Sequence, residues 1–130
     1  MTATSTFSLS TIGQIALVAA DVERAKRFYR DTLGIRHLFD APPKMTFFDC
    51  GGIRLLLGEP EDGAPKTSGS VLYFTVPDIA GAHETLVARG VTFIQPPHLV
   101  TRLPQGELWL AFFHDSEGNT LALLSVNPVD

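Results

Sequence analysis

The stretches IGQIALVAADV at residues 12–22 and VLYFTVPDI at residues 71–79 have the same pattern, and this pattern decides the fold. Each is an apolar run of strand length that ends at an aspartate, Asp21 or Asp78. An aspartate directly before a helix accepts hydrogen bonds from the free backbone N–H groups of the first turn. The two stretches therefore predict a strand followed by a capped helix, once in each half of the chain.

A glycine follows each of the predicted helices. Gly34 and Gly90 come directly after amphipathic segments whose apolar residues fall on one helical face. Glycine adopts the left-handed conformation at a helix C-terminus at little cost, so it is a common stop signal. The spacing predicts helices near Val22–Leu33 and Ile79–Arg89.

The rest of each half also repeats. The segments FFDCGGIRLLL at residues 47–57 and FFHDSEGNTLALL at residues 112–124 each place a tight turn between two apolar strands. Because one four-stranded sheet with one helix cannot bury both of its faces, we expect the two halves to pack together. The sequence therefore predicts an internally duplicated α+β domain.

The composition fits one compact domain and argues against some classes of binding partner. Hydrophobic residues make up 45% of the 130 residues, and the formal net charge is −4. The chain contains no run of Lys and Arg, so we expect neither nucleic acid nor a membrane as a partner. Residues 1–10 do not have the pattern of a signal peptide, and Cys50 is the single cysteine, which is compatible with a reducing compartment. We predict a cytoplasmic protein.

Two motifs resemble those of the vicinal oxygen chelate superfamily, which includes glyoxalases, bleomycin-resistance proteins and dihydroxybiphenyl dioxygenases. DVERAKRFYRDTLG at residues 21–34 resembles the signature of the first module of that family. DSEGN at residues 115–119 is similar to the terminal Asp-Pro-Asp-Gly-Asn turn, with Ser for Pro and Glu for Asp. The resemblance implies two βαβββ modules whose curved mixed sheets surround a cleft. It also implies a homodimer in which both chains contribute to each cleft.

The predicted organisation has four parts. A tail is followed by the first module, a linker rich in Gly, Pro, Ser and charge, and the second module. We expect these parts at residues 1–10, 11–58, 59–70 and 71–126.

The resemblance also implies a divalent metal held by one ligand from each of four strands. The matching positions are Gln14, Val71 and Ala122, and the fourth ligand falls within residues 52–58, where there is no His and no carboxylate. Zinc and related ions need three or four nitrogen, oxygen or sulfur ligands, so one amide is not sufficient. We therefore predict no metal and no cofactor.

The segment from Gln95 to Trp109 makes the second half longer than the first and carries polar residues that suit a ligand site. Prolines stiffen the backbone before His98, and His98 with Glu107 is a candidate general acid–base pair. Alternatively, His98 packs on the prolines and bonds a carbonyl, while Arg102 and Glu107 form a solvated pair. The predicted ligand-binding set is Gln14, Tyr73, His98, Arg102 and Trp109.

Two functions remain open from the sequence. The first is a metal-free protein that binds a small organic ligand in the cleft between the modules and sequesters it, as bleomycin-resistance proteins do. The second is a glyoxalase-like lyase or isomerase that uses His98 and Glu107 or a rebuilt metal site.

Overall fold

A computed structural model describes residues 7–60 and 68–129 of the chain. The predicted linker lies mostly outside the described residues, as does more than half of the predicted tail. None of the described helices combines the length and the apolar composition that a membrane-spanning helix needs.

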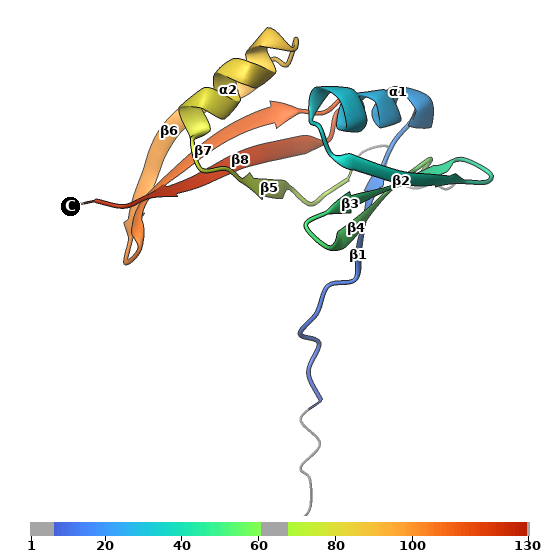
Figure 1. The fold of residues 1–130 in the computed structure, drawn as a ribbon, viewed down its shortest axis with the longest axis horizontal. Coiled ribbons are helices and arrows are strands. Elements are labelled where there is room, and N and C mark those ends of the chain that lie inside the picture. Colours follow the sequence, from blue (N-terminus) through green and yellow to red (C-terminus); the bar gives the residue numbers. More distant parts are fainter. Residues whose placement is uncertain (1–6, 61–67, 130) are drawn as a thin grey trace, which may run out of the picture.

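The chain forms two βαβββ modules, as the sequence predicts (Figure 1). Each module builds one four-stranded mixed sheet, with strand orders β1-β4-β3-β2 and β5-β8-β7-β6. The first strand of each module pairs in parallel with the last strand, and the other pairs are antiparallel. The elements of the first module are β1 (Gln14–Val18), α1 (Val22–Arg27), η1 (Phe28–Thr32), β2 (Arg36–Ala41), β3 (Met45–Cys50) and β4 (Ile53–Gly58). Those of the second are β5 (Leu72–Thr75), α2 (Ile79–Ala88), β6 (Phe93–Leu103), β7 (Gly106–His114) and β8 (Thr120–Asn127).

The predicted caps and stop signals of both helices are confirmed. The side chain of Asp21 accepts from the N–H of Arg24 at 3.0 Å, and that of Asp78 accepts from the N–H of Gly81 at 3.1 Å. Gly34 and Gly90 have φ angles of 75° and 92°, in the left-handed region. The first predicted helix differs in one respect, because its second half, η1, is π-helical.

Both helices lie on the same side of the two sheets (Figure 1). We call this side of each sheet the covered face, to which Leu55, Leu57, Ala111 and Phe113 belong, all at most 1% exposed. The opposite side is the open face, where Leu56 alternates with the buried leucines of β4. The buried side chains of both modules form one continuous core beneath the helices.

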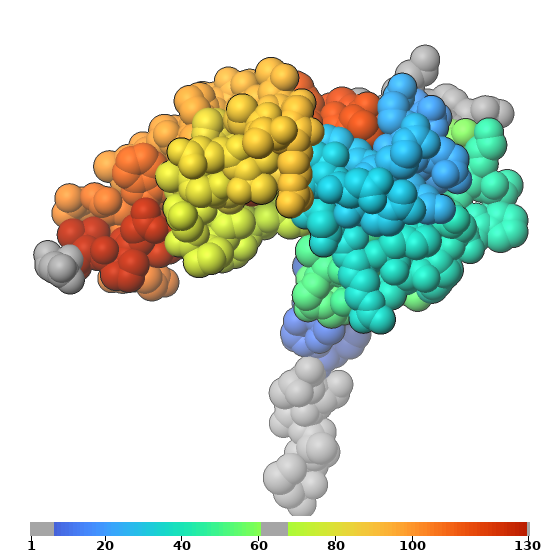
Figure 2. Space-filling view, turned by 45° about the horizontal axis from the view of Figure 1, so that its top comes forward, coloured from blue at the N-terminus to red at the C-terminus, as the bar shows by residue number. Residues whose placement is uncertain are grey.

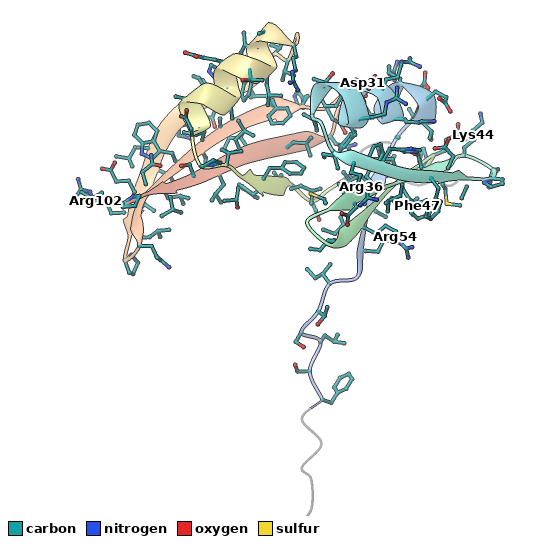
Figure 3. All side chains as sticks on the ribbon, viewed as in Figure 1. Asp31, Arg36, Lys44, Phe47, Arg54 and Arg102 are labelled. Atoms are coloured by element: carbon teal, nitrogen blue, oxygen red, sulfur yellow. The ribbon has the colours of Figure 1, made fainter. Side chains whose placement is uncertain are left out.

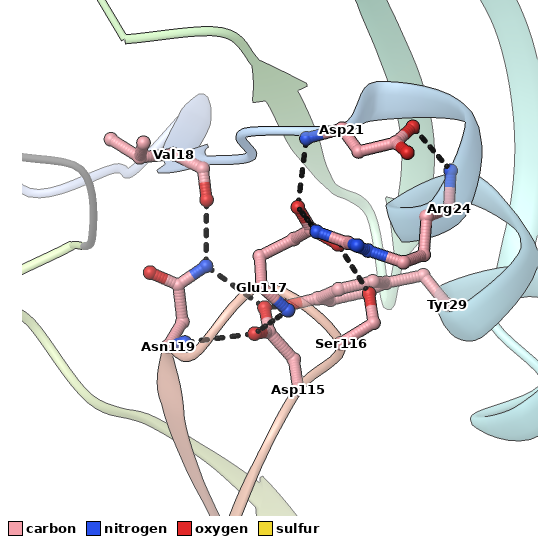
Figure 4. Close-up of polar contacts among 8 residues, drawn as sticks. All are labelled: Val18, Asp21, Arg24, Tyr29, Asp115, Ser116, Glu117 and Asn119. Carbon is pink, nitrogen blue, oxygen red and sulfur yellow. Dashed lines mark hydrogen bonds and ion pairs between the residues drawn. The ribbon is translucent and has the colours of Figure 1, made fainter.

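The two modules are joined by a buried polar network around the turn at residues 115–119 (Figure 4). The hydroxyl of Tyr29 donates to Asp115 Oδ2 at 2.6 Å. Asn119 Nδ2 donates to the carbonyl of Val18 at 2.7 Å, and Glu117 accepts from Arg24 Nε at 2.7 Å. The space-filling view shows the modules in direct contact along this joint (Figure 2).

Candidate functional site

The open face of the first sheet carries a continuous row of polar and aromatic groups. Gln14 Oε1 accepts from Arg54 Nε at 3.1 Å, because these residues are register partners on the parallel strands β1 and β4. The Arg54 guanidinium lies over the ring of Phe47 at 5.4 Å, and Phe47 stacks on Phe39 with ring centroids 4.7 Å apart. Arg54 and Phe47 lie together on the side of the sheet away from the helices (Figure 3). We call Gln14, Arg54, Phe47 and Phe39 the first platform.

The open face of the second sheet carries another aromatic group. The rings of Tyr73 and Phe112 meet edge to face at 6.0 Å, and the His98 ring lies 6.3 Å from that of Phe112. The side chain of Ala122 lies between Tyr73 and Phe112 in the strand register and is fully buried. Tyr73 itself is 48% exposed, so its ring is accessible from solvent. We call Tyr73, Phe112 and His98 the second platform.

The structure does not bring His98 and Glu107 together. His98 pairs with Leu110 across β6 and β7, whereas Glu107 pairs with Arg102 near the end of the hairpin. Leu110 and Glu107 are three residues apart on a regularly paired strand, so they point to opposite faces. His98 Nδ1 instead lies 2.8 Å from the carbonyl of Pro96. A catalytic role for this pair stays a prediction from the sequence.

The two remaining predicted ligand-binding residues, Arg102 and Trp109, do not lie on the open face. Arg102 forms an ion pair with Glu107 at 3.3 Å, and its side chain is 71% exposed at the far end of the second sheet (Figure 3). Such an exposed pair contributes little to stability. Trp109 belongs to the covered face and packs against the core, and its buried Nε1 has no hydrogen-bond partner among the described residues. Of the five predicted residues, Gln14, Tyr73 and His98 lie on open faces.

Two hollows adjoin the first sheet. One, of about 540 Å³, lies on the open face and includes Ala16, Leu56 and Met45 in its lining. The other, of about 700 Å³, lies beside the β2–β3 turn and includes Asp40 in its lining. Hydrogen bonds from Lys26, Thr46 and His37 hold the pKa of Asp40 well below its usual range, so Asp40 stays ionised at the edge of this hollow.

The residues present do not fit the divalent metal that the fold family implies. Gln14 stands two residues before Ala16, which pairs with Leu56 on β4. In the same way, Val71 stands two residues before Tyr73, which pairs with Ala122 on β8. The repeat therefore identifies Leu56 as the fourth ligand position. Three of these four side chains have no donor atom, and the amide oxygen of Gln14 already accepts from Arg54. Within residues 7–60 and 68–129, no three His, Cys, Asp or Glu side chains gather in a metal-binding group.

Sequence reasoning missed the contribution of Arg54. The available signal was its position two residues after the Gly51-Gly52 turn, which fixes the register of β3 and β4. That register alone does not show that Gln14 is the neighbour of Arg54, because β1 lies far away in the sequence.

Comparisons with known proteins agree with this architecture. The sequence model of the Glyoxalase/Bleomycin resistance protein/Dioxygenase superfamily matches residues 11–123. A "Glyoxylase-like domain-containing protein" of Didymella fabae is 32% identical over 131 residues, covering 86% of this chain and 91% of that protein.

Two solved structures show the same fold. The antibiotic binding protein TnmS3 from Streptomyces sp. CB03234 is 26% identical with a TM-score of 0.74, covering 93% of this chain and 99% of its own. Lactoylglutathione lyase from Agrobacterium tumefaciens is 25% identical with a TM-score of 0.70, covering 89% of this chain and 93% of its own.

Proposed function

Because this chain belongs to the Glyoxalase/Bleomycin resistance protein/Dioxygenase superfamily, we propose that it binds a small, flat organic ligand against its open faces without a metal. The observation that carries this proposal is the pair of platforms described above. Each presents aromatic rings to the open side of a sheet, and in the part of the chain that the structure describes neither contains a metal-binding group of three His, Cys, Asp or Glu side chains.

The chemistry of the first platform suits a planar molecule with a hydrogen-bonding edge. Phe39 and Phe47 are already stacked, so a third ring extends the stack at little entropic cost. Arg54 and the N–H₂ group of Gln14 supply donors to a ligand carbonyl or ring nitrogen. An aromatic site with few convergent polar groups is the usual form of a small-molecule pocket.

We further propose that two copies of the chain complete the site. The two platforms belong to different sheets, and both open faces point away from the helices (Figure 1). A ligand held by one platform alone stays exposed on its other side, whereas an opposing sheet from a second copy encloses it. The antibiotic-binding activity named for TnmS3 supports sequestration as the purpose of such binding.

The test has two stages. Native mass spectrometry of the purified protein reports any co-purifying organic adduct, and calorimetry with a panel of bicyclic heteroaromatic compounds then measures affinity. Phe47→Ala and Tyr73→Ala should each weaken binding several-fold, since an aromatic pair contributes about 0.5–1.5 kcal/mol beyond buried area. Val87→Ala, at a half-exposed position on α2, is the matched control and should bind normally. Unchanged affinity in both platform variants would contradict the proposal.

The alternative is a glyoxalase-like lyase or isomerase. The likeness to lactoylglutathione lyase and the position of His98 on an open face favour it. A calorimetric titration with Zn²⁺, Ni²⁺, Mn²⁺ and Co²⁺ separates the two functions. We expect no stoichiometric binding of these metals. Their addition should therefore change the thermal stability of the protein little, since a ligand stabilises only in proportion to its binding to the native state. Stoichiometric micromolar binding that Gln14→Ala abolishes would make the enzyme the better description.

A further inference from the structure

A further cavity, separate from the two hollows beside the first sheet, lies on the covered side of the molecule, where the first module meets α2. Its volume is about 260 Å³, and it is separated from the open face by the second sheet, because Phe113 and Leu123 face it while Phe112 faces the other way. The apolar part of its lining includes Leu33, Ile35, Phe74, Val76, Leu86 and Phe113.

The π-helical turn shapes one wall of this cavity. The N–H of Leu33 donates to the carbonyl of Phe28 at 3.0 Å, and the N–H of Ile35 donates to that of Tyr29 at 2.9 Å. These wide turns bring Leu33 and Ile35 into the cavity lining opposite α2. Single π-helical turns are rare and are often found at functional sites.

The polar residues at the rim of the cavity are Arg89, which is positively charged, and Thr85, which is uncharged. Arg89 Nη1 donates to the carbonyl of Thr32 at 2.9 Å, which anchors the guanidinium at the edge of the cavity. Among the described residues Arg89 has no carboxylate partner within 4.0 Å. The hydroxyl of Thr85 donates to the carbonyl of Gly81 at 3.0 Å. The rim therefore offers a fixed positive charge with free N–H groups to an incoming ligand.

We propose that this cavity binds a small apolar carboxylate, a single-ring aryl acid or a short alkyl acid. The apolar part would lie between α2 and the segment from Leu33 to Ile35, and the carboxylate would pair with Arg89. The volume selects a small molecule, because apolar cavities of about 150 Å³ already hold benzene and drug-sized ligands need about 300 Å³ or more. The guanidinium selects an acid over its amide, because charge-assisted hydrogen bonds are the stronger ones. This site does not depend on the platforms.

The experiment is calorimetry of the full-length protein with phenylacetate, its neutral analogue phenylacetamide, and acetate. We expect saturable binding of phenylacetate, at least tenfold weaker binding of the amide, and no binding of acetate. Ala82→Leu places a larger side chain in the cavity and should abolish binding of the acid. Ala88→Leu makes the same change at an exposed position of the same helix and should not.

A second variant tests the charge. Arg89→Gln should weaken phenylacetate at least tenfold and leave phenylacetamide unchanged, while Tyr73→Ala on the open face should leave both unchanged. Equal binding of acid and amide, or undiminished acid binding by Ala82→Leu, would overturn the proposal. A change in oligomeric state on Ala82→Leu would also overturn it, because a second copy would then be the occupant. Loss of acid binding in Tyr73→Ala would place the acid on the platforms instead.

Discussion

At the scale of single residues, Asp115 is one of the residues that join the two modules. Its carboxylate accepts from the hydroxyl of Tyr29 at 2.6 Å and from the N–H groups of Glu117 and Asn119 at 2.8 Å each. Tyr29 is fully buried, and this burial together with the charge of Asp115 raises the pKa of its hydroxyl above the ordinary value. The phenol therefore stays a neutral donor.

Replacing Tyr29 by Phe should lower the free energy of unfolding by about 1–3 kcal/mol, because a hydrogen bond to a buried charge is lost. Urea denaturation measures the change. Tyr73→Phe is the matched control, since Tyr73 is 48% exposed and should lose little. Equal losses of unfolding free energy in the two variants would show that the buried hydrogen bond of Tyr29 stabilises the fold no more than the exposed hydroxyl of Tyr73 does.

Sequence patterns locate both residues of this contact but not the contact itself. The DSEGN motif at residues 115–119 was recognisable by its resemblance to a family turn. Helical periodicity places Tyr29 on the same apolar face as Val22 and Ala25, and its ring is buried there. Its hydroxyl, however, bonds a residue 86 positions away, and no local pattern carries that information.

At the scale of elements, β7, the second strand of the β6–β7 hairpin, begins at a glycine that no other residue can replace without strain. Gly106 has φ 144°, and a Cβ atom there would overlap the carbonyl oxygen of Asn127 on β8. Gly106→Ala should therefore lower the free energy of unfolding by about 1–3 kcal/mol or more. Gly13→Ala is the control, because apart from its chain neighbours no atom of the described residues lies within 4 Å of a Cβ at that position. Thermal unfolding compares them, and matching midpoints would refute the expected overlap.

Elements were easier to predict than the faces of their residues. A strand, a capping aspartate, a helix and a glycine are local signals, so the βαβββ order could be predicted from sequence. The register of β6 against β7 shifts between Phe93 and Gln95, between Gln95 and His98, and between Leu99 and Thr101. Each shift changes which side chains face the open side. Strict alternation therefore could not show that His98 and Glu107 lie on opposite faces.

At the scale of the whole molecule, an ion pair links the modules and makes their association sensitive to acid. Burial alone would raise the pKa of Glu117, but hydrogen bonds from Arg24, the backbone of Asp21 and Ser116 hold it below the ordinary 4.5. A carboxylate with a lowered folded-state pKa binds fewer protons when folded than when unfolded. Its stabilisation is therefore present above the unfolded pKa and is lost as pH falls through the folded pKa.

Unfolding in urea should consequently become easier as the pH falls from about 5 to about 3. Arg24→Gln removes the main partner of Glu117, so it should flatten this dependence as well as lower stability near neutral pH. Arg102→Gln removes the partner of an exposed pair and should leave the pH profile unchanged. A wild-type slope in Arg24→Gln would mean that other carboxylates, such as Asp40, control the acid sensitivity.

The open faces leave apolar side chains exposed on both sheets. Phe39 is 46% exposed and Tyr73 is 48% exposed, although each belongs to a group of packed aromatic rings. Exposed apolar clusters of this kind commonly mark interfaces. When the open face of the first sheet in one copy packs against the open face of the second sheet in the other copy, both aromatic groups are buried. A two-fold axis then produces the same contact between the remaining two open faces. We therefore expect a homodimer.

Sedimentation equilibrium at about 50 µM should give the dimer mass, which corresponds to a dissociation constant in the micromolar range or tighter. Phe39→Asp should shift the protein to monomer, because it places a charge within the buried contact. Val87→Asp introduces the same charge at a side chain that is 49% exposed on α2, so it should stay dimeric. If wild type sediments as a monomer, the open faces must be closed by a ligand or by another protein. If Val87→Asp alone dissociates, the helices rather than the open faces form the interface, and the enclosed ligand site proposed above would lose its second wall.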